Sequence, residues 1–361
     1  MRGDRLKSIR HSPGLESGLA SCLEALDHAG IDREREIDLI APKPGASPIR
    51  PGFPGHLRIP LFSGIGFLGG VQVLLPENSD AKLAADLPLL GTLSTQASVA
   101  LDNANHYLAL REKTRIESEL QVARKIQMHY VPETPSIPNF SLNGVCLPAQ
   151  EIGGDYLDYF RNENGDWIIV IADVCGKGIP AALVMTSLHS CIRSEGRREK
   201  SSKELLISVN RLMGAELQRE KSFITCLCII LSENGVILNF SRAGHPALVV
   251  SGRSLKAPES FRSKGIALGM VAEEEFRSRL EEINLPLHPG DRFFAYTDGV
   301  DEAKDSLDRP YGKIRLFDLL QRNRDCAPIQ LIEQVLADVR LHVKDHRQYD
   351  DMTFLCLDKI H

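Results

Sequence analysis

Apolar residues recur every three or four positions along two stretches in the first third of the chain. In residues 15–29 this spacing predicts a helix that ends before Gly30. A second helical segment begins near Ala81. The pattern from residue 87 to residue 128 then predicts one long helix, because no proline interrupts it after Pro88. This part of the chain is thus predicted to begin and end in helices.

Between these helices the pattern predicts strands. Residues 37–40 form a short apolar run, and residues 41–55 are predicted to be a loop because they contain five prolines. Residues 56–61 and 69–75 are predicted strands joined by a glycine-containing turn at residues 63–66.

The long predicted helix carries an apolar stripe that continues beyond the strands. Its members recur at helical spacing and are Leu101, Ala104, Leu108, Ile116, Leu120, Ala123 and Ile126. One interpretation is a spacer between two domains. The other is the seam of a parallel homodimer, which we favour because the stripe continues past the first domain. Residues 1–110 are therefore predicted to form one domain and residues 111–131 a coiled-coil linker.

Prolines at positions 132, 135 and 138 end the helix and mark a second domain, residues 132–361. Strands are predicted at 140–147, 167–172, 224–231, 235–241, 247–250, 279–285, 292–297 and 352–357. Helices are predicted at 179–192, 202–217 and 329–343. Successive strands with helices inserted between groups of them favour a layered α+β domain over alternating βαβ units.

Composition narrows the class of protein. A chain of 361 residues with a formal charge of −5 suggests two globular domains and gives no reason to expect nucleic acid as a partner. No apolar run has the length of a membrane span, and the first residues lack the apolar core of a secretory signal. We therefore expect a cytoplasmic protein without a membrane partner.

The eight cysteines show no paired framework. Cys226 and Cys228 would face the same side of a strand, but no second Cys or His pair has the spacing of a zinc site. We interpret them as buried thiols in a protein of a reducing compartment.

Acidic residues stand at the ends of several predicted strands, beside turn residues. They are Asp155, Asp173, Asp298 and the adjacent pair Asp350 and Asp351. Any one alone is typical of a turn or helix cap. Several buried carboxylates together need a cation, and Mg²⁺ or Mn²⁺ prefers carboxylate and carbonyl oxygens. The sequence therefore indicates a metal site built from both halves of the second domain.

Five separated segments of the chain, which include these acidic residues, resemble the motifs of a known family. Residues 151–178, 223–225, 242–247, 296–303 and 349–353 resemble, in order, the motifs of the RsbU/SpoIIE-type serine/threonine phosphatases, a branch of the metal-dependent type-2C (PPM) phosphatases. The resemblance covers about residues 132–358. It implies an αββα sandwich in which two antiparallel sheets hold two Mn²⁺ or Mg²⁺ ions.

The resemblance also implies roles for individual residues. The metal ligands would be Asp155, Asp173, the backbone carbonyl of Val174, Asp298 and one of the pair Asp350 and Asp351. Of that pair we favour Asp350. Asp155, Asp173 and Asp298 would act in catalysis through a metal-activated water that attacks phosphorus. Leu157 and Cys175 replace an aromatic residue and a serine of the family pattern, but neither replacement removes a ligand.

Three further residues allow two interpretations each. His245 is either a general acid or part of a structural turn with its imidazole bonded to backbone, and we favour the turn. Lys177 either contacts a phosphate or a partner, or is a solvated side chain at a helix start. Cys175 precedes a helix and resembles a thiolate nucleophile, but a metal-activated water makes such a nucleophile unnecessary.

Residues 56–110 resemble the second half of a GAF sensory domain. Because the region before them is short, we expect a degenerate GAF-like domain that serves dimerisation or protein input.

Together the resemblances imply a cytoplasmic protein-serine/threonine phosphatase. Its substrate would be a phosphorylated anti-sigma-factor antagonist, a STAS-type anti-anti-sigma protein, in a partner-switching pathway. The alternative is a pseudophosphatase that binds a partner without catalysis. A hydrolase of nucleotides would need a nucleoside pocket, which the sequence does not display. Because the long helix ends about 25 residues before Gly153, a twist in it is expected to move Asp155 relative to Asp173.

Overall fold

The computed structural model describes residues 37–40, 56–63, 66–74, 80–199, 201–252, 255–344, 346 and 348–360. The chain forms two compact units, Met1–Ser118 and Glu119–His361. The helix predicted at residues 15–29 and the loop predicted at 41–55 lie outside the described residues. No helix in the described part of the chain is long and apolar enough to cross a membrane.

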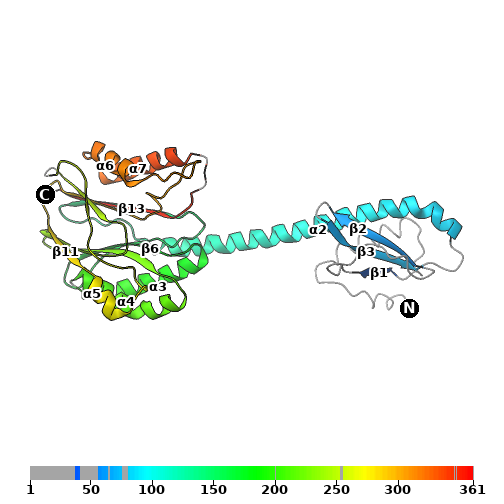
Figure 1. The fold of residues 1–361 in the computed structure, drawn as a ribbon, viewed down its shortest axis with the longest axis horizontal. Coiled ribbons are helices and arrows are strands. Elements are labelled where there is room, and N and C mark those ends of the chain that lie inside the picture. Colours follow the sequence, from blue (N-terminus) through cyan, green and yellow to red (C-terminus); the bar gives the residue numbers. More distant parts are fainter. Residues whose placement is uncertain are drawn as a thin grey trace. The chain divides into compact units, whose positions relative to one another are not determined.

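The described strands of the first unit form one antiparallel sheet (Figure 1). Its order is β1 (Ile37–Ile40), β3 (Gly66–Leu74) and β2 (His56–Ser63). The three strands predicted in this region are therefore confirmed. The GAF-like resemblance of the unit stays a prediction.

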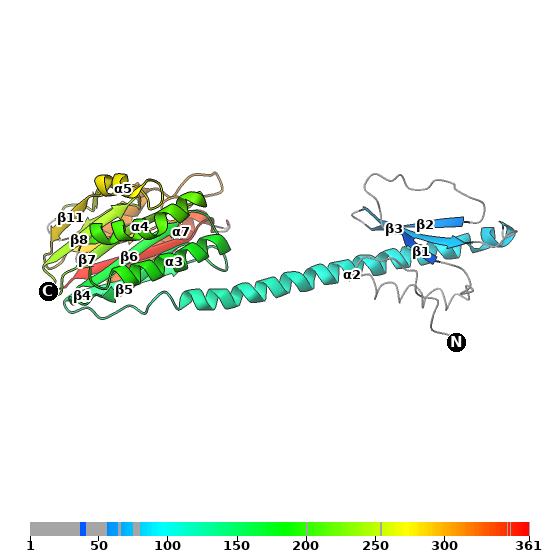
Figure 2. The same ribbon diagram turned by 90° about the horizontal axis from the view of Figure 1, so that it is seen from below.

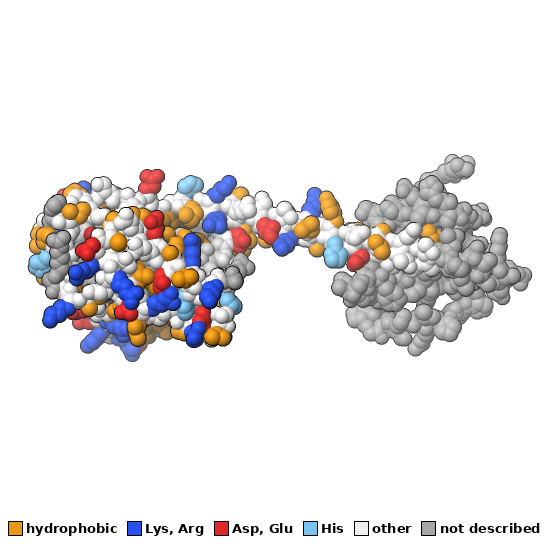
Figure 3. All heavy atoms as spheres, turned by 90° about the horizontal axis from the view of Figure 1, so that it is seen from above, with side chains coloured by type: hydrophobic (Ala, Val, Ile, Leu, Met, Phe, Trp, Pro, Cys, Tyr) orange, Lys and Arg blue, Asp and Glu red, His pale blue; other side chains and the backbone are white. Residues whose placement is uncertain are grey.

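Helix α2 runs without interruption over Asp80–Met128. The sequence suggested two helical segments, but the backbone stays helical through Pro88. Leu101 is buried, whereas Leu108, Ile116 and Ile126 of the same apolar stripe are 42–55% exposed. Figure 3 shows such hydrophobic side chains interspersed with charged ones along the described part of this helix. Among the described residues, the stripe is thus buried at Leu101 and at least partly exposed beyond it.

Two five-stranded antiparallel sheets form the centre of the second unit. Sheet I has the order β11-β8-β7-β6-β5, and sheet II has the order β10-β9-β12-β13-β4. The strands of sheet I are β5 (Tyr156–Arg161), β6 (Trp167–Val174), β7 (Ile224–Leu231), β8 (Ile237–Ala243) and β11 (Glu282–Pro286). Those of sheet II are β4 (Phe140–Leu147), β9 (Leu248–Ser251), β10 (Glu259–Phe261), β12 (Arg292–Tyr296) and β13 (Met352–Lys359).

Helices cover the outer face of each sheet (Figures 1 and 2). Sheet I packs on α3 (Ile179–Glu195), α4 (Ser202–Arg219) and α5 (Glu273–Arg279), and sheet II packs on α6 (Lys313–Arg322) and α7 (Pro328–Val343). A third apolar cluster fills the space between the sheets. The predicted αββα sandwich is therefore confirmed.

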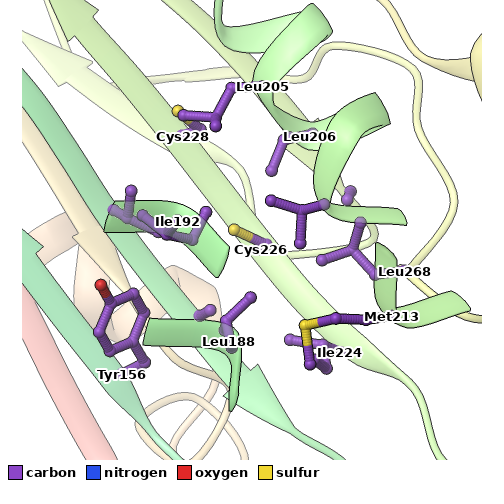
Figure 4. Packing of buried hydrophobic residues seen from close by; sticks show 14 of the residues in the cluster. Tyr156, Leu188, Ile192, Leu205, Leu206, Met213, Ile224, Cys226, Cys228 and Leu268 are labelled. Carbon is purple, nitrogen blue, oxygen red and sulfur yellow. The ribbon is translucent and has the colours of Figure 1, made fainter. Parts of the chain in front are cut away.

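Strand β7 shows how the sequence builds these layers. Cys226 and Cys228 point toward the helices, in the cluster drawn in Figure 4, while Leu227 and Ile229 point toward sheet II. All four side chains are fully buried. The alternation follows from the two-residue period of a strand, and it confirms that both cysteines act as buried apolar groups.

The strand predicted at residues 279–285 is wrong in its first part. Helix α5 occupies Glu273–Arg279, and β11 begins only at Glu282. Acidic residues in the first turn and arginines in the last complement the helix dipole. Phe276 is its one buried side chain, so the apolar period is too weak to reveal the helix.

Strand β10 and helix α6 were not predicted, and β5 was indicated only by the position of Asp155, without bounds. In β5, residues 156–160 are all buried, so the strand lacks the alternation that marks a half-buried strand. Helix α6 buries only Leu316 and Leu320.

Candidate metal centre

The predicted acidic residues come from one end of each sheet. In sheet I the start of β5 pairs with the end of β6, with Tyr156 opposite Ala172, so Asp155 and Asp173 lie at the same end. In sheet II the end of β12 pairs with the start of β13, which brings Asp298 to the end where Asp350 and Asp351 precede β13. Antiparallel pairing thus gathers residues that are far apart in the sequence.

Asp155 joins the two sheets at this end. Its Oδ2 accepts hydrogen bonds from the hydroxyls of Thr297, at 2.9 Å, and Thr353, at 2.6 Å. Thr297 directly follows β12 and Thr353 lies in β13, so both belong to the side of sheet II. Its Oδ1 is buried and has no hydrogen-bond partner. Because buried polar atoms normally have partners, this oxygen is a candidate ligand atom. Sequence reasoning gave the two threonines no role.

Both carboxylate oxygens of Asp351 accept hydrogen bonds from backbone N–H groups. Its Oδ1 accepts from the N–H of Ala149 and its Oδ2 from the N–H of Gly154, each at 2.7 Å. A Cβ on Gly153 would lie 2.3 Å from that Oδ2, so the position requires glycine. Both oxygens of Asp351 therefore hold the loop that leads into Asp155.

Asp350 is more open. Its Oδ1 accepts from the N–H of Asp351 at 3.0 Å, and its Oδ2 lies 3.1 Å from the Nζ of Lys177. Its side chain is 38% exposed. Of the adjacent pair, Asp350 thus has the less constrained carboxylate, and our preference for it as a metal ligand stays a prediction.

The carboxylates lie close enough to repel one another. Burial, followed by the charge of Asp173, raises the pKa of Asp155 well above its usual range. Burial and the charges of Asp298, Asp350 and Asp351 raise the pKa of Asp173 to about 7, while Lys177 opposes this shift. Burial, Glu302 and Asp350 raise the pKa of Asp298. A divalent cation would relieve this repulsion.

The backbone of Val174 lies beside the same loop. A Cβ on Gly154 would be 2.9 Å from the Val174 carbonyl oxygen, so this oxygen lies close to the residue that precedes Asp155. Carboxylates with a backbone carbonyl are the donor set that Mg²⁺ and Mn²⁺ prefer. Among the described residues, however, no three His, Cys, Asp or Glu side chains are arranged to hold an ion together. The donor chemistry fits a metal, but the side chains do not form a ready-made cage.

The end of helix α2 contacts this loop through Gln127, a residue that the sequence analysis did not identify. The side-chain amide of Gln127 bonds both to the carbonyl oxygen and to the N–H of Gly153. The sequence of a helix gives no signal that distinguishes a polar side chain with a specific partner, such as Gln127, from one that is solvated.

Asp158, three residues after Asp155, forms an ion pair with Arg193. Asp158 of β5 is fully buried, and its carboxylate accepts hydrogen bonds from the Nε and Nη2 of Arg193 in α3 and from the Tyr156 hydroxyl. A single acidic residue inside the apolar run of β5 was the available signal.

His245 is a buried structural residue. Gly244, before it, has a φ of 71°, which fits the predicted turn. The imidazole Nδ1 lies 2.9 Å from the Thr225 hydroxyl. Burial and the nearby charge of Arg242 lower the pKa of His245 to about 3. A neutral, buried imidazole does not supply the proton of a general acid.

Cys175 is exposed, but partial desolvation and the charge of Asp173 raise the pKa of its thiol. The thiolate that a nucleophile requires is therefore disfavoured.

Two known proteins are similar to this chain in sequence. The chain is 26% identical over 267 residues to Protein IcfG of Synechocystis, and 24% identical over 249 residues to phosphoserine phosphatase RsbP of Bacillus subtilis. These alignments cover 66% and 68% of this chain but only 41% and 59% of the relatives.

Solved structures show the same architecture. The SiaA-PP2C domain of Pseudomonas aeruginosa superposes with a TM-score of 0.60 at 21% identity, covering 68% of this chain and 98% of that one. The RsbU and RsbW domains of Rv1364c from Mycobacterium tuberculosis superpose with a TM-score of 0.52 at 22% identity, covering 64% of this chain and 62% of that one. The second unit therefore has the PP2C fold.

Residues 163–359 match the family described as Stage II sporulation protein E (SpoIIE). Since this match covers more than half of the 361 residues, the chain belongs to the SpoIIE family.

Proposed function

We propose that this chain is a metal-dependent protein-serine/threonine phosphatase. The observation that carries the proposal is that acidic residues from both sheets meet at one end of the sandwich. There Thr297 and Thr353, on the side of sheet II, donate hydrogen bonds to Asp155, at the start of a strand of sheet I. The ligands of two Mn²⁺ or Mg²⁺ ions would be Asp155, Asp173, the Val174 carbonyl, Asp298 and Asp350. Bound ions would supply an activated water and neutralise the oxygens of the phosphoryl group.

The chain's own residues prepare this site. Thr297 and Thr353 fix Oδ2 of Asp155 and leave Oδ1 for an ion. Asp351 holds the Gly153–Gly154 backbone, so that the loop is shaped before any ion binds. Mutual repulsion among the carboxylates favours a cation over an empty, fully ionised site.

We further propose a phosphoserine or phosphothreonine of an anti-sigma-factor antagonist as the substrate. The relative RsbP is named a phosphoserine phosphatase, which supports this substrate chemistry. The STAS-type antagonist and the cytoplasmic partner-switching pathway rest on the family resemblance. The N-terminal unit and α2 would regulate the enzyme.

The test uses the full chain and a phosphorylated STAS-type protein. We expect phosphate release that requires Mn²⁺ and disappears in Asp155→Asn and Asp298→Asn. Asp325→Asn is the control, since that carboxylate is 89% exposed in another part of the unit. Undiminished turnover in a chelator, or in both site variants, would refute the proposal.

A pseudophosphatase is the second candidate. It is favoured by the lack of any three described side chains positioned to hold an ion together. Hydrolysis of an aryl phosphate separates the two, because it needs the metal centre but no partner protein. Stimulation by Mn²⁺ supports the enzyme, and a rate equal to that of Asp155→Asn supports the partner-binding protein.

The exposed stripe of α2 supports a homodimer as a further part of the proposal. Sedimentation should find a dimer, and Ile116→Glu should shift it toward monomer. A wild-type monomer at working concentration would contradict the dimer and leave the phosphatase proposal intact.

A further inference from the structure

The Lys177 side chain lies over the segment that contains Asp350. Its Nζ is 3.1 Å from Oδ2 of Asp350 and donates to the carbonyl oxygen of Tyr349. The same ammonium group lies 3.6 Å from the centroid of the Tyr349 ring. Three favourable contacts therefore hold one cation against a carboxylate that we propose as a metal ligand.

With Lys177 in place, both oxygens of Asp350 have partners. Oδ1 accepts from the N–H of Asp351, and Oδ2 faces the ammonium group. A metal ion bound to Oδ2 would lie within a few ångströms of that positive charge, which like-charge repulsion opposes. Lys177 and a metal ion therefore compete for this oxygen.

The local backbone allows Lys177 to leave. It lies between Gly176, with a φ of 103°, and Gly178, with a φ of 70°. A Cβ on Gly176 would have no atom within 4 Å, so this side of the loop is open. The lysine side chain is 33% exposed, so water is available to solvate the ammonium group after it moves.

We propose that Lys177 is a built-in cation that competes with the metal for Asp350 and must release it before the centre loads. The inference rests on the proposed function and deepens it, because the lysine would set the metal concentration at which the enzyme becomes active.

A second lysine provides a matched control. Lys313 lies 3.4 Å from Asp301, which is near Asp298 but is not a proposed ligand. Lys313→Met removes the same charge from the same region without freeing a ligand. The comparison separates direct competition for Asp350 from a general change in electrostatic potential.

The experiment measures Mn²⁺ binding to the full chain, with free Mn²⁺ counted by electron paramagnetic resonance. We expect Lys177→Met to tighten binding about two- to fivefold, the range that a partly exposed ion pair allows. Lys313→Met should have a smaller effect, and Lys177→Met should bring no gain in an Asp350→Asn background. Equal or weaker binding by Lys177→Met, or an equal gain from Lys313→Met, would overturn the inference.

Failure of the inference is distinguishable from failure of the proposed function. If neither wild type nor Lys177→Met binds Mn²⁺, the metal centre itself is refuted. If wild type binds Mn²⁺ and Lys177→Met binds it no more tightly, only the competition is refuted.

A second measurement keeps Lys177 in the chain. Lysines are labelled with ¹³C-methyl groups, which keep their charge, and the Lys177 signal is identified by its absence in Lys177→Arg. We expect this signal to move as Mg²⁺ is added, while that of Lys313 moves less. A Lys177 signal that stays fixed while the protein binds Mg²⁺ would contradict the release.

Discussion

The side-chain amide of Gln127 donates to the carbonyl oxygen of Gly153 at 2.7 Å and accepts from the N–H of the same residue at 3.1 Å. Three residues farther along the chain, the centroid of the Tyr130 ring lies 4.7 Å from that of His189 in α3. The last turn of α2 and the residues after it are thus fastened both to the loop before Asp155 and to a helix of the second unit. This gives the predicted link between the long helix and the site a specific pair of residues.

Replacing Gln127 with Ala should destabilise the second unit. Both hydrogen bonds to a partly buried backbone would be lost, which costs about 1–3 kcal/mol of unfolding free energy. Urea unfolding followed by Trp167 fluorescence measures this, since Trp167 is the single tryptophan of the chain and lies in β6. Gln121→Ala, an exposed position on the same helix, is the control. Equal stabilities of the two variants would show that the Gln127 contact is unimportant.

Asp350→Asn should mainly weaken Mn²⁺ binding, whereas Asp351→Asn should mainly lower the stability of the fold. Asn at 351 would set an amide N–H₂ against the N–H of Ala149 or Gly154, and the lost hydrogen bond costs about 1–3 kcal/mol of unfolding free energy. Asn at 350 should change stability less, because that side chain is partly exposed, but should weaken Mn²⁺ binding more. Urea unfolding and Mn²⁺ titration of both variants measure the two effects. If Asp351→Asn weakened Mn²⁺ binding more than Asp350→Asn at unchanged stability, the roles would be reversed.

Arg193→Met should leave the buried carboxylate of Asp158 without its cation. Because Arg193 is itself 38% exposed, we expect a loss of about 2–3 kcal/mol, below the range for a fully buried pair. The double variant Asp158→Asn/Arg193→Met should recover part of this loss. Arg277→Met, which breaks the more exposed ion pair with Glu204, should cost less than about 1 kcal/mol. Additive losses in the double variant would contradict the coupling.

His245 should make stability depend on pH. Its folded-state pKa is about 3, below the value of about 6.5 in an unfolded chain. As the pH falls below about 6.5, the unfolded state gains a proton that the folded state does not, so stability is lost. Between pH 7 and pH 5 this amounts to about 2 kcal/mol.

The comparison of wild type with His245→Asn isolates that contribution, because other groups titrate alike in both proteins. The variant's loss of unfolding free energy between pH 7 and pH 5 should be smaller by about the same 2 kcal/mol. His129→Asn, at an exposed position, should keep the wild-type dependence. An unchanged pH dependence in His245→Asn would show that the imidazole titrates alike in the folded and unfolded protein.

The positions of the acidic residues could be predicted because their signals are local. Each follows or precedes an apolar run and stands beside turn residues, as Asp173 does at the end of β6. The alternation of β7 is local as well. A strand that is buried on both faces, such as β5, loses this signal, and a helix with two buried residues, such as α6, barely has one.

The partners of the acidic residues could not be predicted. Thr297 and Thr353 lie 142 and 198 positions from Asp155, and contacts over such separations leave no periodicity in the sequence. Asp350 and Asp351 are neighbours with the same side chain, and distant groups distinguish their contacts: the N–H groups of Ala149 and Gly154 for Asp351, and Lys177 for Asp350.

The bonds from Thr297 and Thr353 to Asp155 have a consequence for hydrogen exchange. They join the two sheets with polar contacts at the end where repelling carboxylates gather, while an apolar cluster joins them elsewhere. Local opening of this end therefore requires less free energy than global unfolding. The amide hydrogens of Ala149 and Gly154, which donate to Asp351, should exchange with solvent through that opening. Their exchange should slow when a cation binds, so that these two amides report occupancy of the site without any substrate.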